Sequence, residues 1–133
     1  MTSSEDIRPI ERFYESWARG DIDAALECTT PDVELDWSES IAPFMDVYRG
    51  HDAIRLFWLE SEDAWDEFGF VVEEVRECGA GRVVVRTRVQ GRASATGLEL
   101  EALGAMVWVV RGGKIVSGKL FQSMNEALAA THG

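Results

Sequence analysis

The sequence predicts an α+β fold, with helices first and a run of antiparallel strands last. Apolar residues in the first half recur at helical spacing, whereas the second half is rich in β-branched and aromatic runs. Gly112-Gly113 lies between two such runs and indicates a two-residue hairpin loop, because these turns need positive φ at both central residues. The length of 133 residues suits one domain with a sizeable core, and we expect a single domain over residues 1–133.

Three helices are expected before the run of strands. The first covers residues 4–19, and Gly20 ends it. Asp21 is a good N-cap for a short second helix over residues 22–28. A third helix runs from about residue 50 to about residue 66. The first helix carries an inward aromatic stripe at positions i, i+3, i+4 and i+7, made by Ile10, Phe13, Tyr14 and Trp17.

The strands follow from period-two alternation. A short strand over residues 33–37 places Leu35 and Trp37 on one face and Glu34 and Asp36 on the other. Residues 38–49 are expected to be irregular, with a length typical of a lid or rim. The later strands are expected at residues 68–78, 83–90, 98–110 and 115–121, and a short tail helix capped by Ser123 at residues 125–130.

The Gly112-Gly113 turn predicts a register for the last hairpin. If pairing continues one for one from Arg111 and Lys114, Met106 lies opposite Lys119. Lys119 and Phe121 then share the apolar face with Met106 and Trp108, and Lys119 is its single charge. An ammonium group on an apolar face is costly unless it is paired. Lys119 could therefore bind a ligand carboxylate or enolate, act as a base, or neutralise Asp36 or Glu34; alternatively, it reaches water along its stem.

Charge and composition exclude several classes of partner. Thirteen basic and 24 acidic residues give a net charge of −11, which argues against nucleic acid and anionic membrane surfaces. No apolar run is long enough to span a membrane, and the polar, acidic start does not resemble a signal peptide. We expect a cytoplasmic protein. Cys28 and Cys78 lack metal or redox spacing, so we expect no metal and no cofactor.

Several motifs carry a family resemblance. They are Phe13-Tyr14-x-x-Trp17-x-x-Gly20-Asp21, Pro31-Asp32-Val33-Glu34-x-x-Trp37, Tyr48-Arg49-Gly50-x-Asp52-Ala53-Ile54, Gly91-Arg92 through Gly97-Leu98-Glu99, Val107-Trp108 and Gly113-Lys114-Ile115-Val116. In these segments the chain resembles the SnoaL-like branch of the nuclear-transport-factor-2-like (NTF2-like) superfamily, which is related to ketosteroid isomerase. The resemblance implies a cone, in which a strongly bent antiparallel sheet wraps round the N-terminal helices and leaves a pocket at the open end. It also implies a homodimer formed through the outer face of the sheet.

The resemblance does not fix the chemistry, because its members include isomerases, cyclases, dehydratases and proteins that only bind or assemble. Asp36 falls close to the position of the isomerase base. Phe13 falls at the position of the isomerase phenol, with Tyr14 one residue away. Met106 falls near the second acid of the isomerase and near the aspartate of the cyclases. Two of the three isomerase groups are therefore missing.

If the protein is catalytic, we expect cofactor-free isomerisation, cyclisation or dehydration. Asp36 would be the base, and Lys119 or Tyr14 would stabilise the oxyanion. In the alternative, Asp36 is a solvated carboxylate on an edge strand and Tyr14 packs its ring in the core. An apolar wall that serves as core and as ligand-binding surface is expected from Phe13, Trp17, Trp37, Trp58, Met106, Trp108 and Phe121.

The expected function is binding of a small, largely apolar molecule that carries a carbonyl or carboxylate. The alternative is a non-catalytic homodimeric binding or assembly module whose pocket is filled by its own aromatic rings. A pocket of about a few hundred Å³ with Lys119 or Asp36 on its wall would favour the first hypothesis. A packed cone would favour the second.

Overall fold

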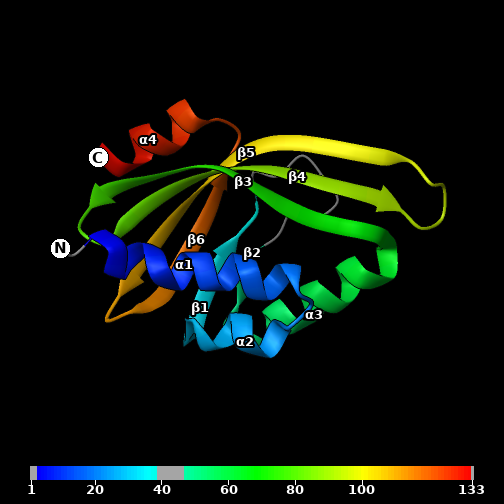
Figure 1. Ribbon diagram of the computed structural model, residues 1–133, viewed down its shortest axis with the longest axis horizontal. Coiled ribbons are helices and arrows are strands. Elements are labelled where there is room, and N and C mark those ends of the chain that lie inside the picture. Colours follow the sequence, from blue (N-terminus) through cyan, green and yellow to red (C-terminus); the bar gives the residue numbers. More distant parts are fainter. Residues whose placement is uncertain (1–2, 39–46, 133) are drawn as a thin grey trace.

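The computed structural model describes residues 3–38 and 47–132 and confirms the α+β class (Figure 1). The elements in chain order are α1 (Ser3–Ala18), α2 (Ile22–Glu27), β1 (Thr29–Asp36), β2 (Val47–Arg49), α3 (Gly50–Ala64), β3 (Trp65–Gly79), β4 (Arg82–Ala93), β5 (Glu99–Arg111), β6 (Lys114–Phe121) and α4 (Met124–His132). Strand β2 falls within the stretch expected to be irregular, and residues 39–46 of that stretch lie outside the described residues.

Six strands form one sheet in the order β2-β1-β6-β5-β4-β3. Strands β3 to β6 make the expected antiparallel meander, but β1 pairs with β6 in parallel. The sheet is therefore mixed rather than wholly antiparallel. The parallel pair arises because α3 carries the chain from β2 to the far edge of the sheet, and the meander then returns to β1.

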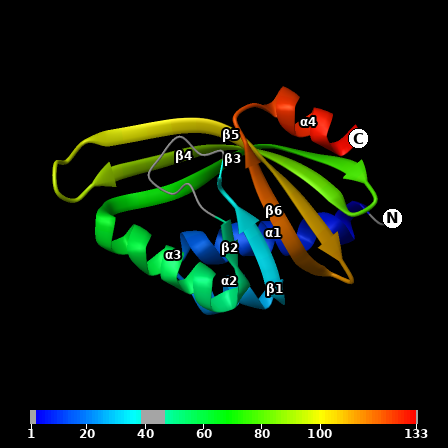
Figure 2. The same cartoon turned by 180° about the vertical axis from the view of Figure 1, so that it is seen from behind.

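Figures 1 and 2 show α1, α2 and α3 on one face of the sheet and α4 on the other. We call these the inner and the outer face. The main core lies on the inner face, where the predicted stripe of α1 is buried: Ile10, Phe13 and Trp17 are at most 6% exposed. A smaller core lies beneath α4 and centres on Val84 and Ala105.

Two helix starts form as the sequence predicts. Gly20 has a φ of +76°, and the Asp21 carboxylate then accepts a hydrogen bond from the Ala24 backbone N–H at 3.1 Å. The Ser123 hydroxyl accepts from the backbone N–H of Glu126 at 3.2 Å at the start of α4. These caps satisfy backbone donors that have no partner inside a helix.

The last hairpin turns where predicted, but its register differs. Gly112 and Gly113 both have positive φ, and Arg111 pairs with Lys114. Val110 then pairs with Ile115, whereas the preceding residue of β5, Val109, pairs with Ser117. The intervening residue of β6 forms a β-bulge, which moves every later residue of the strand to the other face. The predicted one-for-one register is therefore wrong beyond the first pairs.

The bulge places Lys119 and Phe121 on the outer face. Lys119 lies opposite Val107, is exposed, and holds its ammonium 5.3 Å from the centre of the Phe121 ring. Phe121 packs against the small core beneath α4. Lys119 is not the lone charge of the inner apolar face, since Gly118 and Leu120 take the inner positions opposite Trp108 and Met106.

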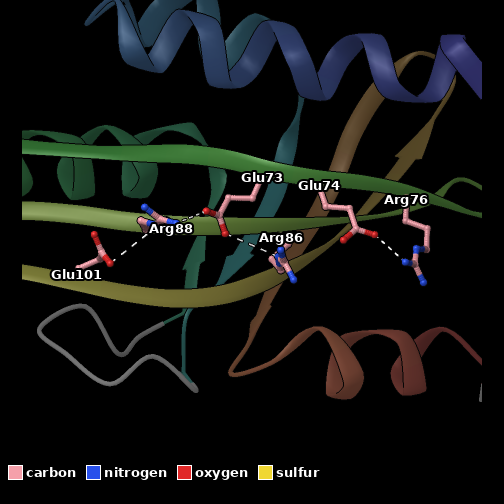
Figure 3. Close-up of polar contacts among 6 residues, drawn as sticks. All are labelled: Glu73, Glu74, Arg76, Arg86, Arg88 and Glu101. Carbon is pink, nitrogen blue, oxygen red and sulfur yellow. Dashed lines mark hydrogen bonds and ion pairs between the residues drawn. The ribbon is translucent and has the colours of Figure 1, made fainter.

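The rest of the outer face carries a row of alternating charges, which Figure 3 shows across β3, β4 and β5. Glu73 pairs with Arg86 and Arg88, and Arg88 also lies 4.0 Å from Glu101. The Arg88 guanidinium therefore lies between a carboxylate of β3 and a carboxylate of β5. Exposed ion pairs contribute only about 0–1 kcal/mol each, so the row defines the chemistry of this surface more than its stability.

Candidate functional site

The inner face contains a cavity walled by aromatic rings. Helix α1 contributes three rings, and the remaining walls come from the end of β1, from α3, from β3 and from β5. The lining residues are Phe13, Tyr14, Trp17, Leu35, Trp37, Phe57, Phe70, Met106 and Trp108. The described residues leave a volume of about 10 Å³, which is room for about one water molecule.

The rings of this cavity hold one another by edge-to-face contacts. Trp37 meets Phe57 with ring centres 5.2 Å apart and planes at 85°. Trp17 meets the same Phe57 ring at 5.8 Å and 85°. Such contacts add about 0.5–1.5 kcal/mol each beyond the area that they bury. The wall is therefore part of the core, as the aromatic stripe predicted.

Tyr14 places a hydrogen-bond donor on the wall. Its hydroxyl oxygen accepts from the indole N–H of Trp108 at 3.1 Å, and no described residue accepts its own hydrogen. Tyr14 as a whole is half-buried, but its hydroxyl end is enclosed. Burial raises the pKa of Tyr14 well above its usual value, and the bond from Trp108 offsets only part of this rise. The phenol therefore stays protonated at neutral pH and can donate.

Trp37 adds a second donor. Its side chain is 4% exposed, and its indole nitrogen is buried without a hydrogen-bond partner. A buried donor left unpaired costs about 1–3 kcal/mol, so most such groups have a protein or water partner. Two lining residues, Tyr14 and Trp37, thus each carry a side-chain donor that lacks an acceptor among the described residues.

Asp36, the predicted base, does not line this cavity. It lies on the face of β1 opposite Leu35 and Trp37, and its carboxylate accepts from the Ser38 backbone N–H at 2.9 Å and from the Ser38 hydroxyl at 2.6 Å. Burial pushes the pKa of Asp36 up, but the Ser38 bonds and the nearby cations Lys119 and Arg49 together bring it below its usual value. Asp36 is held as a carboxylate on the outer side.

Lys119 lies in register with Asp36 on the parallel pair of β1 and β6. The structure therefore supports the alternative role of Lys119, which is to balance the charge of Asp36. Trp58 and Phe121 were expected on the apolar wall but do not line the cavity. Trp58 is half-buried on α3 and packs against the edge of the main core.

Sequence reasoning missed Leu35, Phe57 and Phe70 as lining residues. Leu35 could have been found from alternation, since it shares a strand face with Trp37. Phe57 could have been found from its place on the inner face of the third helix. Phe70 carried no such signal, because its face depends on the pairing of β3 with Val89 of β4.

The described residues form neither a candidate metal-ligand cluster nor a membrane-spanning helix. No group of three or more His, Cys, Asp or Glu side chains there is placed to hold a metal ion. None of the described helices is long and apolar enough to cross a membrane.

Comparison with known proteins identifies the family. The family model described as the SnoaL-like domain matches residues 10–118. An uncharacterized protein of Mycobacterium tuberculosis is 30% identical over 118 residues, which is 86% of each chain. Among solved structures, an NTF2-like protein of Burkholderia thailandensis is 25% identical with a TM-score of 0.79, over 96% of this chain and 97% of that one.

Three more distant structures share the fold. TerC, co-crystallized with polyporic acid, has 20% identity and a TM-score of 0.76, over 97% of this chain and 99% of its own. A Mycobacterium tuberculosis protein in complex with estradiol-17β-hemisuccinate has 14% identity and a TM-score of 0.76, over 91% and 95%. A candidate SnoaL-like polyketide cyclase from Jannaschia has 16% identity and a TM-score of 0.74, over 96% and 92%. The chain belongs to the SnoaL-like domain family of the NTF2-like superfamily.

Proposed function

We propose that the protein binds a small, largely apolar molecule through an acceptor oxygen held in the aromatic cavity. The supporting observation is the pair of donors without acceptors, the Tyr14 hydroxyl and the Trp37 indole N–H, on a wall otherwise made of rings and a few aliphatic side chains. A carbonyl, phenolate or carboxylate oxygen can accept from both donors. The proposed ligand is therefore an aromatic or polycyclic molecule with such an oxygen.

The cavity volume limits how the ligand enters. About 10 Å³ admits one oxygen-sized group, so the acceptor oxygen takes the place of a water molecule. The rings of the ligand then require lining side chains to shift. Phe70 is only partly buried, unlike Trp37 and Phe57 beside it, and it is the ring that we expect to move.

Structural relatives support the ligand class. TerC was crystallized with polyporic acid and the distant Mycobacterium tuberculosis protein with estradiol-17β-hemisuccinate. Both are relatives in fold, and neither is close enough in sequence to fix the ligand of this chain. The donors Tyr14 and Trp37 supply the independent reason to expect an acceptor oxygen.

We propose binding rather than proton-transfer catalysis. The described residues that line the cavity include no carboxylate, imidazole or amine that could act as a base. Asp36 lies on the outer side, with its charge stabilised by Ser38, and Tyr14 is held protonated. Isomerisation, cyclisation or dehydration with Asp36 as base and Lys119 as stabiliser is not supported by this geometry.

The small volume also favours a second candidate. A module whose cavity is filled by its own rings would show the same edge-to-face packing around Phe57 and the same small volume. In that case the two donors are satisfied by a water molecule, and no ligand enters. Ligand binding separates the two candidates.

The test is a thermal-shift screen of ketones, quinones, phenols and aromatic carboxylates, with mass spectrometry of any molecule that co-purifies with the native protein. Binding through the cavity predicts a saturable rise in Tm for at least one class. It also predicts loss of that rise in Tyr14→Phe and its retention in Asp36→Asn. The absence of any saturable shift across the screen would favour the filled module.

We also infer that two copies pair through the outer face of the sheet. Leu103 is 61% exposed and Val71 is 43% exposed, and both lie beside the alternating row of Glu73, Arg88 and Glu101. A surface that carries both signs of charge round apolar residues can be complementary to itself across a two-fold axis. Sedimentation equilibrium should show a dimer that Leu103→Glu converts to monomer. A monomeric native protein would contradict the inference.

A further inference from the structure

A second hollow lies at the other end of the inner side and shares no residue with the aromatic cavity. It has a volume of about 980 Å³ and lies between the first half of α1, the end of α2, the start of β1 and the β5–β6 turn. Figure 1 shows these segments gathered near the N-terminus. We call this hollow the basal groove. Its volume falls in the range of sites for small molecules.

Basic groups converge on the basal groove, although the chain as a whole carries a net charge of −11. Arg8, Arg12, Lys114 and His51 line it, against two acidic residues, Asp6 and Glu27. Arg8 and Arg12 are four residues apart on α1, so their like charges are neighbours and repel. This repulsion does not stabilise the fold. An anion bound between the two guanidinium groups would attract both of them and replace the repulsion by a net attraction.

Neither of these two arginines makes a hydrogen bond or ion pair with the residues that the structure describes. By contrast, Arg49, Arg55 and Arg88 each pair with a carboxylate. The groove therefore holds two guanidinium groups whose donors are not used by the fold. A guanidinium group can donate two parallel hydrogen bonds to two oxygen atoms of a carboxylate or a phosphate.

Lys114 is fixed in place and keeps spare donors. Its ammonium donates to the backbone carbonyl of Glu27, the last residue of α2. An ammonium has three N–H donors, so two remain for a ligand. The contact places this cation at the end of α2, in the lining that also includes Arg8 and Arg12.

His51 is held in one orientation by Thr29. The Thr29 hydroxyl donates its single hydrogen to the Leu26 carbonyl at 2.7 Å. The contact of 2.9 Å between Thr29 Oγ1 and His51 Nε2 is therefore a donation from the imidazole to the hydroxyl. This bond uses the Nε2 hydrogen. In the neutral ring Nδ1 is then an acceptor, so His51 can donate to an oxyanion from Nδ1 only as the imidazolium.

We propose that the basal groove binds a small oxyanion with two or more negative charges, either a phosphate compound or a di- or tricarboxylate. Arg8 and Arg12 bind it from α1, and Lys114 contributes a third positive charge. The proposal does not depend on the aromatic cavity, because the two sites have no residue in common.

The test is isothermal titration of the full chain with pyrophosphate and, separately, with citrate, at an ionic strength held constant with NaCl. The groove variant is Arg8→Gln/Arg12→Gln. The control is Arg76→Gln/Arg86→Gln, which removes the same charge from β3 and β4, outside the groove. Arg8 and Arg12 are exposed, so we expect both variants to fold, and circular dichroism checks this.

Saturable binding of either probe, weakened about tenfold or more in the groove variant but unchanged in the control, supports the site, since bonds to charged groups are the stronger ones. The probe that binds identifies the preferred group. Equal weakening in both variants would show a general effect of charge and overturn the proposal. So would the absence of saturable binding of both probes to the native chain.

Discussion

The indole N–H of Trp108 donates to the phenol oxygen of Tyr14 at 3.1 Å, which joins β5 to α1 across the inner face. The bond occupies the acceptor of Tyr14 and leaves its hydrogen for another partner. The other side of the same indole lies against Gly118 of β6. Trp108 therefore contacts both the Tyr14 phenol of the cavity and strand β6, which pairs with β1.

Removing the phenol should destabilise the protein. In Tyr14→Phe the Trp108 N–H loses its acceptor in a buried site, which should lower the free energy of unfolding by about 1–3 kcal/mol. Urea unfolding followed by circular dichroism measures the change. A double-mutant cycle with Trp108→Phe isolates the bond, because Tyr14→Phe should cost less once the indole is gone. Strictly additive costs would contradict the bond.

Burial of Tyr14 should also appear in the pH dependence of stability. Its pKa is raised by burial above the usual value of 10.0, so the native state keeps a proton that the unfolded state loses at high pH. Stability is therefore full below about pH 10 and falls above it, by about 1.4 kcal/mol per pH unit. Unfolding in urea between pH 8 and pH 11 should show a shallower fall for Tyr14→Phe. Parallel curves for the two proteins would contradict an enclosed phenol.

The contact between Trp108 and Gly118 predicts the effect of adding a single methyl group. A Cβ at Gly118 would lie 2.5 Å from Trp108 Cζ3, so Gly118→Ala must displace the indole. We expect a loss of about 1–3 kcal/mol, typical of overpacking a core. Gly69→Ala is the matched control, since a Cβ there meets nothing within 4 Å. Chemical denaturation compares them, and equal stability of the two variants would show that the space at Gly118 is open.

The bulge in β6 predicts which of two neighbouring side chains belongs to the core. Leu120 is 8% exposed and faces Met106, so Leu120→Ala should cost about 2–5 kcal/mol. Lys119→Ala should change stability by no more than about 1 kcal/mol, because the ammonium near Phe121 and Asp36 is exposed to water. Thermal and urea unfolding of both variants decide the register. The opposite order of costs would restore the register predicted without a bulge.

Local patterns predicted the elements but not the register of the last strand. The aromatic stripe of α1, the Asp21 cap and the turn at Gly112 and Gly113 each depend on a few neighbouring residues, and all are confirmed. The bulge sets Gly118 against the Trp108 ring, which is a contact between strands that no local pattern reports. A single added residue then reversed the faces of Lys119 and Phe121, and with them the predicted charge on the apolar wall.

The cavity itself was only partly predictable for the same reason. Phe13, Tyr14, Trp17, Trp37, Met106 and Trp108 were expected on the apolar wall or at the site and do line it. Alternation correctly placed Asp36 on the face opposite Trp37. Asp36 could therefore reach the cavity as a base only if β1 had a bulge at this point, and β1 pairs there without one. Alternation gave the right face, whereas the role of base suggested by the resemblance needs Asp36 in a cavity that it does not line.

The most direct test of the central claim is calorimetric titration of the native protein, Tyr14→Phe and Asp36→Asn with the compound that gives the largest shift in the thermal screen. A ligand oxygen bound by the Tyr14 hydroxyl predicts affinity about tenfold or more weaker for Tyr14→Phe and unchanged for Asp36→Asn. Undiminished affinity in Tyr14→Phe, or a loss confined to Asp36→Asn, would contradict it.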